Sequence, residues 1–262
     1  HVDSPSWREI RGEDAPGLLL VCNAGEEGLG NLKGVRKICE DYGGRIKSFC
    51  TFDSSLSSIV DRAVGSKRFR VKVRTRGGHS YNDFGNDNAI AGLASLVGKL
   101  YKIQVPEGGK TTYNVGMISG GTSVNTIAQE AEMLYEFRSD KRENLEYMER
   151  QFMEVLDRAK AEGMDVSFQV IGVRPCEGQV DPAQKQALTD WAHRVVEEMT
   201  GQAPKHHAGS TDCNIPLSLG IPSVCVGSFR GAGAHTREEY VETDSLEEGY
   251  KVAFGMIFGR RD

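Results

Sequence analysis

Two adjacent carboxylates, Glu26 and Glu27, are the residues most suited to chemistry in this chain. They follow the apolar run 18–21, which predicts a short buried strand, and they lie in a glycine-flanked turn. Ligands of open α/β sheets gather outside the carboxyl ends of strands. One carboxylate could bind a metal ion while its neighbour takes a proton from a metal-bound water. Because a bare Glu-Glu pair is more often a solvated acidic turn, the interpretation depends on the rest of the chain.

Two further side chains have types that would complete such a site. Asp53 follows the strand predicted over residues 46–52, and His235 lies in a glycine-rich loop after the strand predicted over 222–226. Carboxylate oxygens and an imidazole nitrogen suit Zn²⁺, with Mn²⁺ or Co²⁺ as substitutes. Taken singly, an Asp after a strand is usually a helix cap and a loop His is usually a surface residue.

The elements that must position these residues form an α/β domain interrupted by an insert. Strand and helix patterns alternate over residues 17–52 and return from residue 181. Between them, alternating strands are predicted at 68–74, 111–118, 129–138 and 165–173. One helix, opened by Asn86 or Asp87, follows the first strand, and another follows the third. This order is the ferredoxin-like, split βαβ arrangement. We therefore expect a catalytic α/β domain over 1–66 and 176–262, and an α+β domain over 67–175.

Composition narrows the class of protein. The 262 residues carry a net charge of −5 and no basic stripe, which argues against nucleic acid and membrane surfaces as partners. The six cysteines include no CxxC pair, so we expect free thiols and a cytoplasmic protein. No G-x-G-x-x-G opens a helix after the first predicted strand, which argues against a Rossmann-like nucleotide binder.

Three motifs together resemble one family. GEEGLGNLKG, then TFDSS, then GAGAHTREEYVE are similar to the co-catalytic zinc peptidases and deacylases. That family includes peptidase T, carboxypeptidase G, aminoacylase, acetylornithine deacetylase and succinyl-diaminopimelate desuccinylase. The resemblance implies a hydrolase that cleaves amide bonds in small peptides or N-acyl amino acids, with two zinc ions per intact subunit. Glu26 would be the general base, Glu27 and His235 would bind one metal, and Asp53 the other.

The resemblance also assigns roles outside the metal site. In RGGHSYNDFG, His79 would stabilise the charge developing on the scissile carbonyl, and in dimeric members this residue reaches the partner's site. The insert would then form a homodimer. Both His79 and Arg138 also have a purely structural interpretation: His79 would cap its loop, and Arg138 would form a salt bridge at a strand end. The residues implied to bind substrate are Asn125, Arg138, Gly209, Ser210 and Thr211, with Asp212 in the same loop.

The chain departs from the family at its start. Members begin with a long portion that carries an H-x-D motif and an Asp bridging both metals. His1 and Asp3 resemble that motif but lie too close to Glu26, and Asp14 is a weak candidate for the bridging residue. We therefore expect an incomplete metal site. The alternative function is a catalytically incomplete relative or fragment that acts through its dimerisation domain. Peptidase and deacylase activity remain open alternatives.

Overall fold

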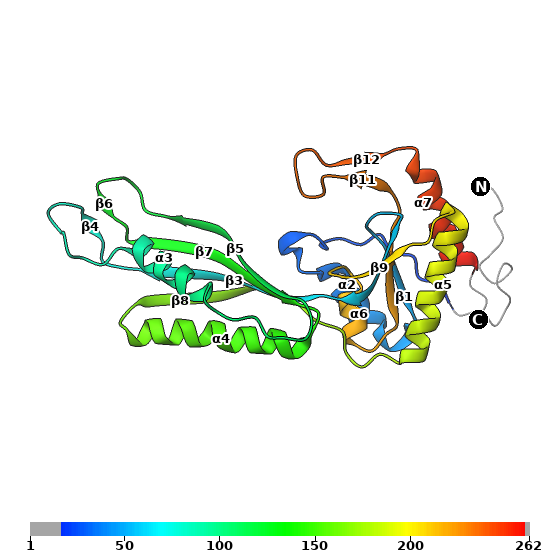
Figure 1. Cartoon of the computed structure of the whole chain (residues 1–262), viewed down its shortest axis with the longest axis horizontal. Coiled ribbons are helices and arrows are strands. Elements are labelled where there is room, and N and C mark those ends of the chain that lie inside the picture. Colours follow the sequence, from blue (N-terminus) through cyan, green and yellow to red (C-terminus); the bar gives the residue numbers. More distant parts are fainter. Residues whose placement is uncertain (1–16, 260–262) are drawn as a thin grey trace. The chain divides into compact units, whose positions relative to one another are not determined.

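The computed structural model describes residues 17–259, which form two compact units (Figure 1). One unit comprises residues 17–63 together with residues 178–259, and the other is Val64–Glu177. The second unit contains the whole of the predicted insert, residues 67–175. His1, Asp3 and Asp14, which were considered above as metal ligands, lie outside the described residues.

The Val64–Glu177 unit is a four-stranded antiparallel sheet covered by two helices. Its sheet order is β5-β7-β3-β8, and a separate small ribbon pairs β4 with β6. This order, with α3 after the first long strand and α4 after the third, confirms the predicted ferredoxin-like arrangement. The elements are β3 (Gly65–Arg74), β4 (Gly78–His79), α3 (Ala89–Leu100), β5 (Thr111–Gly120), β6 (Thr126–Ile127), β7 (Glu130–Ser139), α4 (Arg142–Ala161) and β8 (Asp165–Arg174).

Alternation along β3 and β7 decides which face of this sheet receives the helices. Phe69, Val71 and Val73 are buried, whereas Arg70 and Lys72 between them pair with glutamates of β7 on the other face. Phe69 packs on Phe152 of α4 with ring centroids 4.3 Å apart. Each such buried side chain contributes roughly 1.5–3 kcal/mol. The start of α3 differs from the prediction: Asn88, and not Asn86 or Asp87, caps it, because its side chain accepts hydrogen bonds from two free backbone amides.

The other unit is built around a short mixed sheet of order β1-β10-β2-β9. β1 and β10 are parallel, β2 and β9 are parallel, and the two pairs run in opposite directions. The four residues of β10 are buried, and α5 and α7 contribute side chains to the same core. The elements are η1 (Gly28–Gly30), α2 (Lys33–Tyr42), η2 (Gly43–Arg45), β1 (Phe49–Phe52), β2 (Ser58–Ala63), α5 (Pro182–Thr200), β9 (Lys205–Gly209), α6 (Asn214–Ser218), β10 (Ser223–Val226), β11 (Arg230–Ala232), β12 (Tyr240–Glu242), α7 (Ser245–Phe254) and the closing π-helical turn η3 (Gly255–Gly259).

The first predicted strand was wrong. Residues 18–21 form no strand, and Leu20 is 68% exposed. A strand exists only where a neighbour accepts and donates its lateral hydrogen bonds, and this run pairs with none of the strands in the described part of the chain. Conversely, β2 was not predicted, and the segment with His206 and His207, interpreted as a loop, is the edge strand β9.

A series of three side chains connects β9 to its surroundings. His206 Nδ1 lies 2.8 Å from Asp61 Oδ2 of β2, and its Nε2 lies 2.9 Å from His193 Nδ1 of α5. The two rings are nearly parallel, with 12° between their planes. Edge strand β9 is therefore held by its pairing with β2 and by the contact of His206 with His193 of α5. No helix formed by residues 17–259 is both long and apolar enough to cross a bilayer.

Candidate functional site

The Glu26–Glu27 turn is flanked by residues with positive φ, a backbone conformation that few residue types adopt readily. Gly25 has φ +80° before the pair, and Asn31 and Leu32 have φ +54° and +60° after it. Glu27 caps η1, and its carbonyl accepts a 2.8 Å hydrogen bond from Gly30 N–H. Glu26 is half-buried and Glu27 is exposed. The turn therefore presents two adjacent carboxylates in different environments.

This turn is joined to the loop that follows β9. The Asn23 amide donates a short hydrogen bond to Asp212 Oδ2, across 189 residues of sequence. Thr211 and Asp212 are buried. Two hydrogen bonds stabilise the loop: Thr211 N–H donates to Asn214 Oδ1 at 2.9 Å, and Cys213 N–H donates to Thr211 Oγ1 at 3.1 Å. The structure thus brings the Glu26 turn and the loop of Gly209, Ser210 and Thr211 together.

Asp53 lies where β1 ends, next to β10. Its N–H donates to Val226 O at 3.1 Å, and its carbonyl accepts from the Cys225 thiol at 3.1 Å. Burial raises the pKa of Cys225 above its usual range, and the Cys213 thiol, the Asp53 carboxylate and the Glu26 carboxylate add to that shift. Both carboxylates thus act electrostatically on the same buried thiol, and Asp53 also contacts it through its backbone carbonyl.

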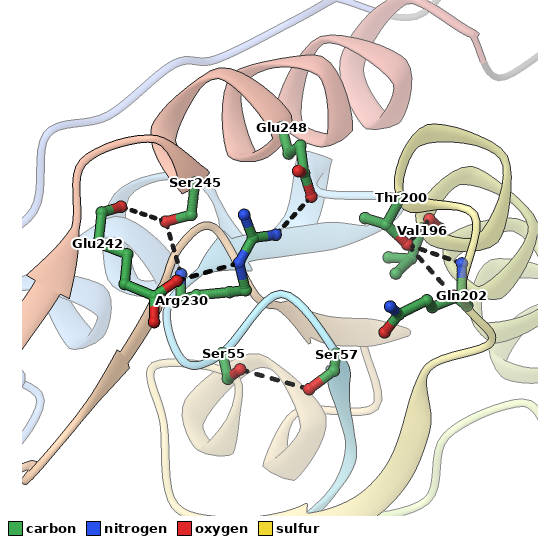
Figure 2. A network of polar contacts seen from close by, with 9 residues as sticks. All are labelled: Ser55, Ser57, Val196, Thr200, Gln202, Arg230, Glu242, Ser245 and Glu248. Carbon is green, nitrogen blue, oxygen red and sulfur yellow. Dashed lines mark hydrogen bonds and ion pairs between the residues drawn. The ribbon is translucent and has the colours of Figure 1, made fainter.

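His235 lies in the loop of the β11–β12 hairpin and has a left-handed backbone, φ +66°. Its N–H donates to Glu239 Oε2 at 3.1 Å, so a local hydrogen bond holds this conformation, which is uncommon for a non-glycine residue. Figure 2 shows the base of the same hairpin, where Arg230 lies between Glu242 at 3.3 Å and Glu248 of α7 at 2.6 Å. Ser245 Oγ accepts from Arg230 N–H and donates to Glu242 O.

We expect Arg230→Ala to loosen the hairpin that carries His235 without unfolding the unit. Both carboxylates that fix the base would lose their partner, but partly exposed ion pairs contribute little to global stability. Amide hydrogen exchange over residues 231–241 should become about two- to tenfold faster, with the midpoint of thermal unfolding almost unchanged. Arg237→Ala, in the hairpin loop, is the matched control. Unchanged exchange in Arg230→Ala would show that the network does not order the hairpin.

The described residues do not by themselves form a metal centre. Within residues 17–259, no three His, Cys, Asp or Glu side chains lie close enough together to hold a metal ion. Glu27, Asp53 and His235 are therefore not assembled into one set of ligands in this part of the chain. Zinc needs about four ligands in a structural site and three in a catalytic one.

His79 and Asn125 lie together in the Val64–Glu177 unit. His79 of β4 pairs with Thr126 of β6, and Ser80 N–H donates to Asn125 O at 3.0 Å. The His79 Nδ1 atom accepts from the N–H groups of Tyr81 and Asn82 at 3.3 and 3.4 Å. In a neutral imidazole the proton is then on Nε2, which remains a donor. In this tautomer the Nε2–H group can donate a hydrogen bond to a carbonyl oxygen.

Arg138 is not part of that group. It lies near the far end of β7, eight residues beyond Glu130, which corresponds to about 26 Å along the strand. Its guanidinium already holds the Glu136 carboxylate, with contacts of 2.9 and 3.2 Å. Burial alone would raise the pKa of Glu136, but Arg138 and Arg68 outweigh it, so the pKa is lowered. The structure therefore contains the salt bridge that was the alternative interpretation of Arg138.

Sequence reasoning missed two residues that hold the site loops. Asp83 accepts from His79 N–H at 2.7 Å, and Asn23 binds Asp212. A signal existed for Asp83, because an Asp in a glycine-flanked loop commonly bonds nearby backbone amides. No local signal identified Asn23, whose partner is distant in sequence.

We expect the thiols to differ sharply in reactivity. Cys22 is exposed, whereas Cys39, Cys176, Cys213 and Cys225 are buried, and burial raises the pKa of Cys213 well above its usual range. Maleimide should therefore modify Cys22 about a hundredfold faster than the buried thiols, which react only after local or global opening. Peptide mapping after a short pulse measures this. Rapid modification of Cys213 or Cys225 in the native protein would contradict the buried core.

Comparison with known proteins adds to this picture. A family model described as a peptidase dimerisation domain matches residues 63–164. A protein of Haemophilus influenzae, named as a homologue of one of the subunits of p-aminobenzoyl-glutamate hydrolase, is 34% identical over 191 residues, covering 65% of this chain and 42% of that protein. Aminopeptidase PepT of Bacillus cereus has a TM-score of 0.67 and 23% identity, with 90% of this chain and 62% of that one covered.

A tripeptidase of Staphylococcus aureus has a TM-score of 0.69 and 22% identity over the same two shares, 90% and 62%. The chain thus spans 42% of the curated relative and 62% of each of these two solved structures. At these identities the two structures show the fold alone. The chain is thus similar, over part of their lengths, to a domain described as a peptidase dimerisation domain, to a relative named after an amide hydrolase and to two peptidase structures.

Proposed function

We propose that this chain hydrolyses amide bonds in small peptides or N-acyl amino acids, as part of a homodimeric enzyme. The observation that carries the proposal is the hydrogen bond from Asn23 to Asp212, which fixes the half-buried Glu26 turn to the buried Thr211–Asp212 loop. A half-buried carboxylate next to a braced loop is suited to activating water.

The chain's own residues would perform two proton-related tasks. The Glu26 carboxylate takes a proton from the attacking water and passes it to the leaving amine, which is general acid–base catalysis. The Nε2–H group of His79 donates a hydrogen bond to the oxygen on which negative charge develops. The two backbone amides that bind Nδ1 keep the proton on Nε2, and Asp83 holds the backbone N–H of His79. Asn125, Thr211 and the neighbouring Gly209 and Ser210 would bind the substrate.

We propose Glu27 and His235 as ligands of one zinc ion and Asp53 as a ligand of a second, with Mn²⁺ or Co²⁺ as substitutes. Carboxylate and imidazole donors suit these ions. Complete sites need further donors, which residues 17–259 do not supply. The second candidate function is that of a relative that acts only through its dimerisation domain, for which the matched residues 63–164 are the observation.

The dimer would form through the Val64–Glu177 unit. β5 is an edge strand of its sheet, and Met117 and Ile118 on it are exposed. An exposed strand edge favours pairing with a second copy, which a two-fold axis makes self-complementary. We propose a cytoplasmic location because all six cysteines are free thiols. We also propose that Arg138 binds a substrate carboxylate. Its guanidinium would then have to bind Glu136 and the substrate at the same time.

The names of the similar proteins guide the choice of test substrates. One is named after p-aminobenzoyl-glutamate hydrolase and another is called a tripeptidase. Purified protein should be assayed with p-aminobenzoyl-glutamate, a tripeptide and N-acetyl amino acids, with and without added Zn²⁺, Mn²⁺ or Co²⁺. We expect turnover of at least one substrate class with metal present. If none is cleaved while the protein sediments as a dimer, the dimerisation-only function is correct.

A further inference from the structure

Three large apolar side chains on the loops that carry His79 and Asn125 are almost fully exposed to solvent. Tyr81 is 86% exposed, Phe84 is 91% exposed and Val124 is fully exposed at 102%. All three lie on two loops, residues 79–88 and 121–125, which we call the tip of the Val64–Glu177 unit. Apolar side chains grouped in this way indicate a surface that binds something.

The tip is a braced structure and not a loose loop. Asp83 N–H donates to His79 O at 2.9 Å, and the Asn86 amide donates to Gly77 O at 2.7 Å. The two loops are joined by the β4–β6 pairing, and Ser123 Oγ donates to Asn125 Oδ1 at 2.9 Å. The exposed side chains are therefore held in place next to His79 and Asn125.

We propose that Tyr81, Phe84 and Val124 form an apolar wall of the substrate pocket in a second copy of this chain. They would select substrates with an aromatic or bulky apolar group beside the scissile amide. The inference rests on the proposed function. The occupant is a second copy because the residues matched as a peptidase dimerisation domain, 63–164, include the whole tip. The same loops also present the two polar groups, His79 and Asn125, that the reaction would use.

The physical basis is desolvation on both sides. In the free chain these side chains are hydrated, and closing them over an apolar substrate group removes water from both surfaces. A small substrate such as an N-acetyl amino acid gains nothing from the wall. Each apolar contact of this kind discriminates about tenfold or more between a large and a small group.

The first test compares kcat/KM for N-benzoyl-glutamate and N-acetyl-glutamate. Phe84→Ser, Tyr81→Ser and Val124→Ser should each lower the benzoyl-to-acetyl ratio about tenfold, with Val124 having the smallest effect. His79→Ala should lower both activities and leave the ratio unchanged. The controls are the exposed residues Tyr250→Ser and Val105→Ser, which should change neither activity. An unchanged ratio in Tyr81→Ser and Phe84→Ser would overturn the proposal.

The second test does not depend on activity. Phe84 is replaced by the photo-crosslinking amino acid p-benzoyl-phenylalanine, and crosslinked peptides are mapped in the full chain. We expect a dimer-sized product joined to residues 17–63 or 178–259 of the other copy. A crosslink confined to the same copy, to residues 64–177 of the other copy, or to another protein would overturn the proposal. If no substrate is cleaved but the expected crosslink forms, the proposed function fails while the docking of the tip stands.

Discussion

Glu26→Gln is expected to lower kcat roughly 10²–10⁴-fold while leaving KM and the fold almost unchanged. The amide has nearly the shape of the carboxylate but cannot take a proton from water. Glu26 is half-buried in a turn whose geometry is set by Gly25, Asn31 and Leu32, so the substitution should not alter the backbone. The measurement is steady-state kinetics with the best substrate from the panel, together with circular dichroism and the metal content of the purified protein.

Two other glutamates serve as controls for that experiment. Glu27→Gln should lower metal content together with activity, because we assign Glu27 as a ligand. Glu40→Gln, on the exposed side of α2, should change neither. If Glu26→Gln loses metal as well as activity, Glu26 is a ligand and not the base. Normal turnover in Glu26→Gln would remove it from the mechanism.

His79→Ala is expected to lower kcat about 10²–10³-fold, the usual cost of losing one donor to a developing oxyanion. If His79 acts in the partner's site, mixing this variant with inactive Glu26→Ala should restore activity. Half of the dimers in an equal, fully exchanged mixture contain one of each variant, and each of those has one complete site. The expected recovery is therefore about a quarter of the wild-type activity.

The mixing experiment needs proof of subunit exchange, for example from differently labelled copies. His207→Ala, an exposed histidine on β9, is the control and should retain activity. Activity that stays at background after demonstrated exchange means that His79 acts within its own chain or has no role. A protein that sediments as a monomer at assay concentration would exclude the dimer itself.

The sequence by itself determined the elements whose pattern is local. Alternation of Phe69, Val71 and Val73 with charged residues identified β3, and the same period identified β5, β7 and β8. Helical spacing identified α4 and α5. Because the order of these elements restricts a small domain to few topologies, the ferredoxin-like insert followed from the sequence. The family resemblance of the Glu26, Asp53 and His235 motifs was also readable from the chain, since each motif is a short contiguous segment.

The tertiary structure decided what depends on partners distant in sequence. Residues 18–21 have the composition of a buried strand but pair with no strand of the described residues, whereas the polar His206–His207 segment became β9 because β2 lies beside it. Strand pairing is a non-local interaction, and composition alone does not reveal it. The same reason explains the Asn23–Asp212 contact, the separation of Arg138 from His79, and the His79 tautomer, which two backbone amides fix. The sequence thus gives the chemical type of each side chain, whereas the tertiary structure determines which of those side chains are in contact.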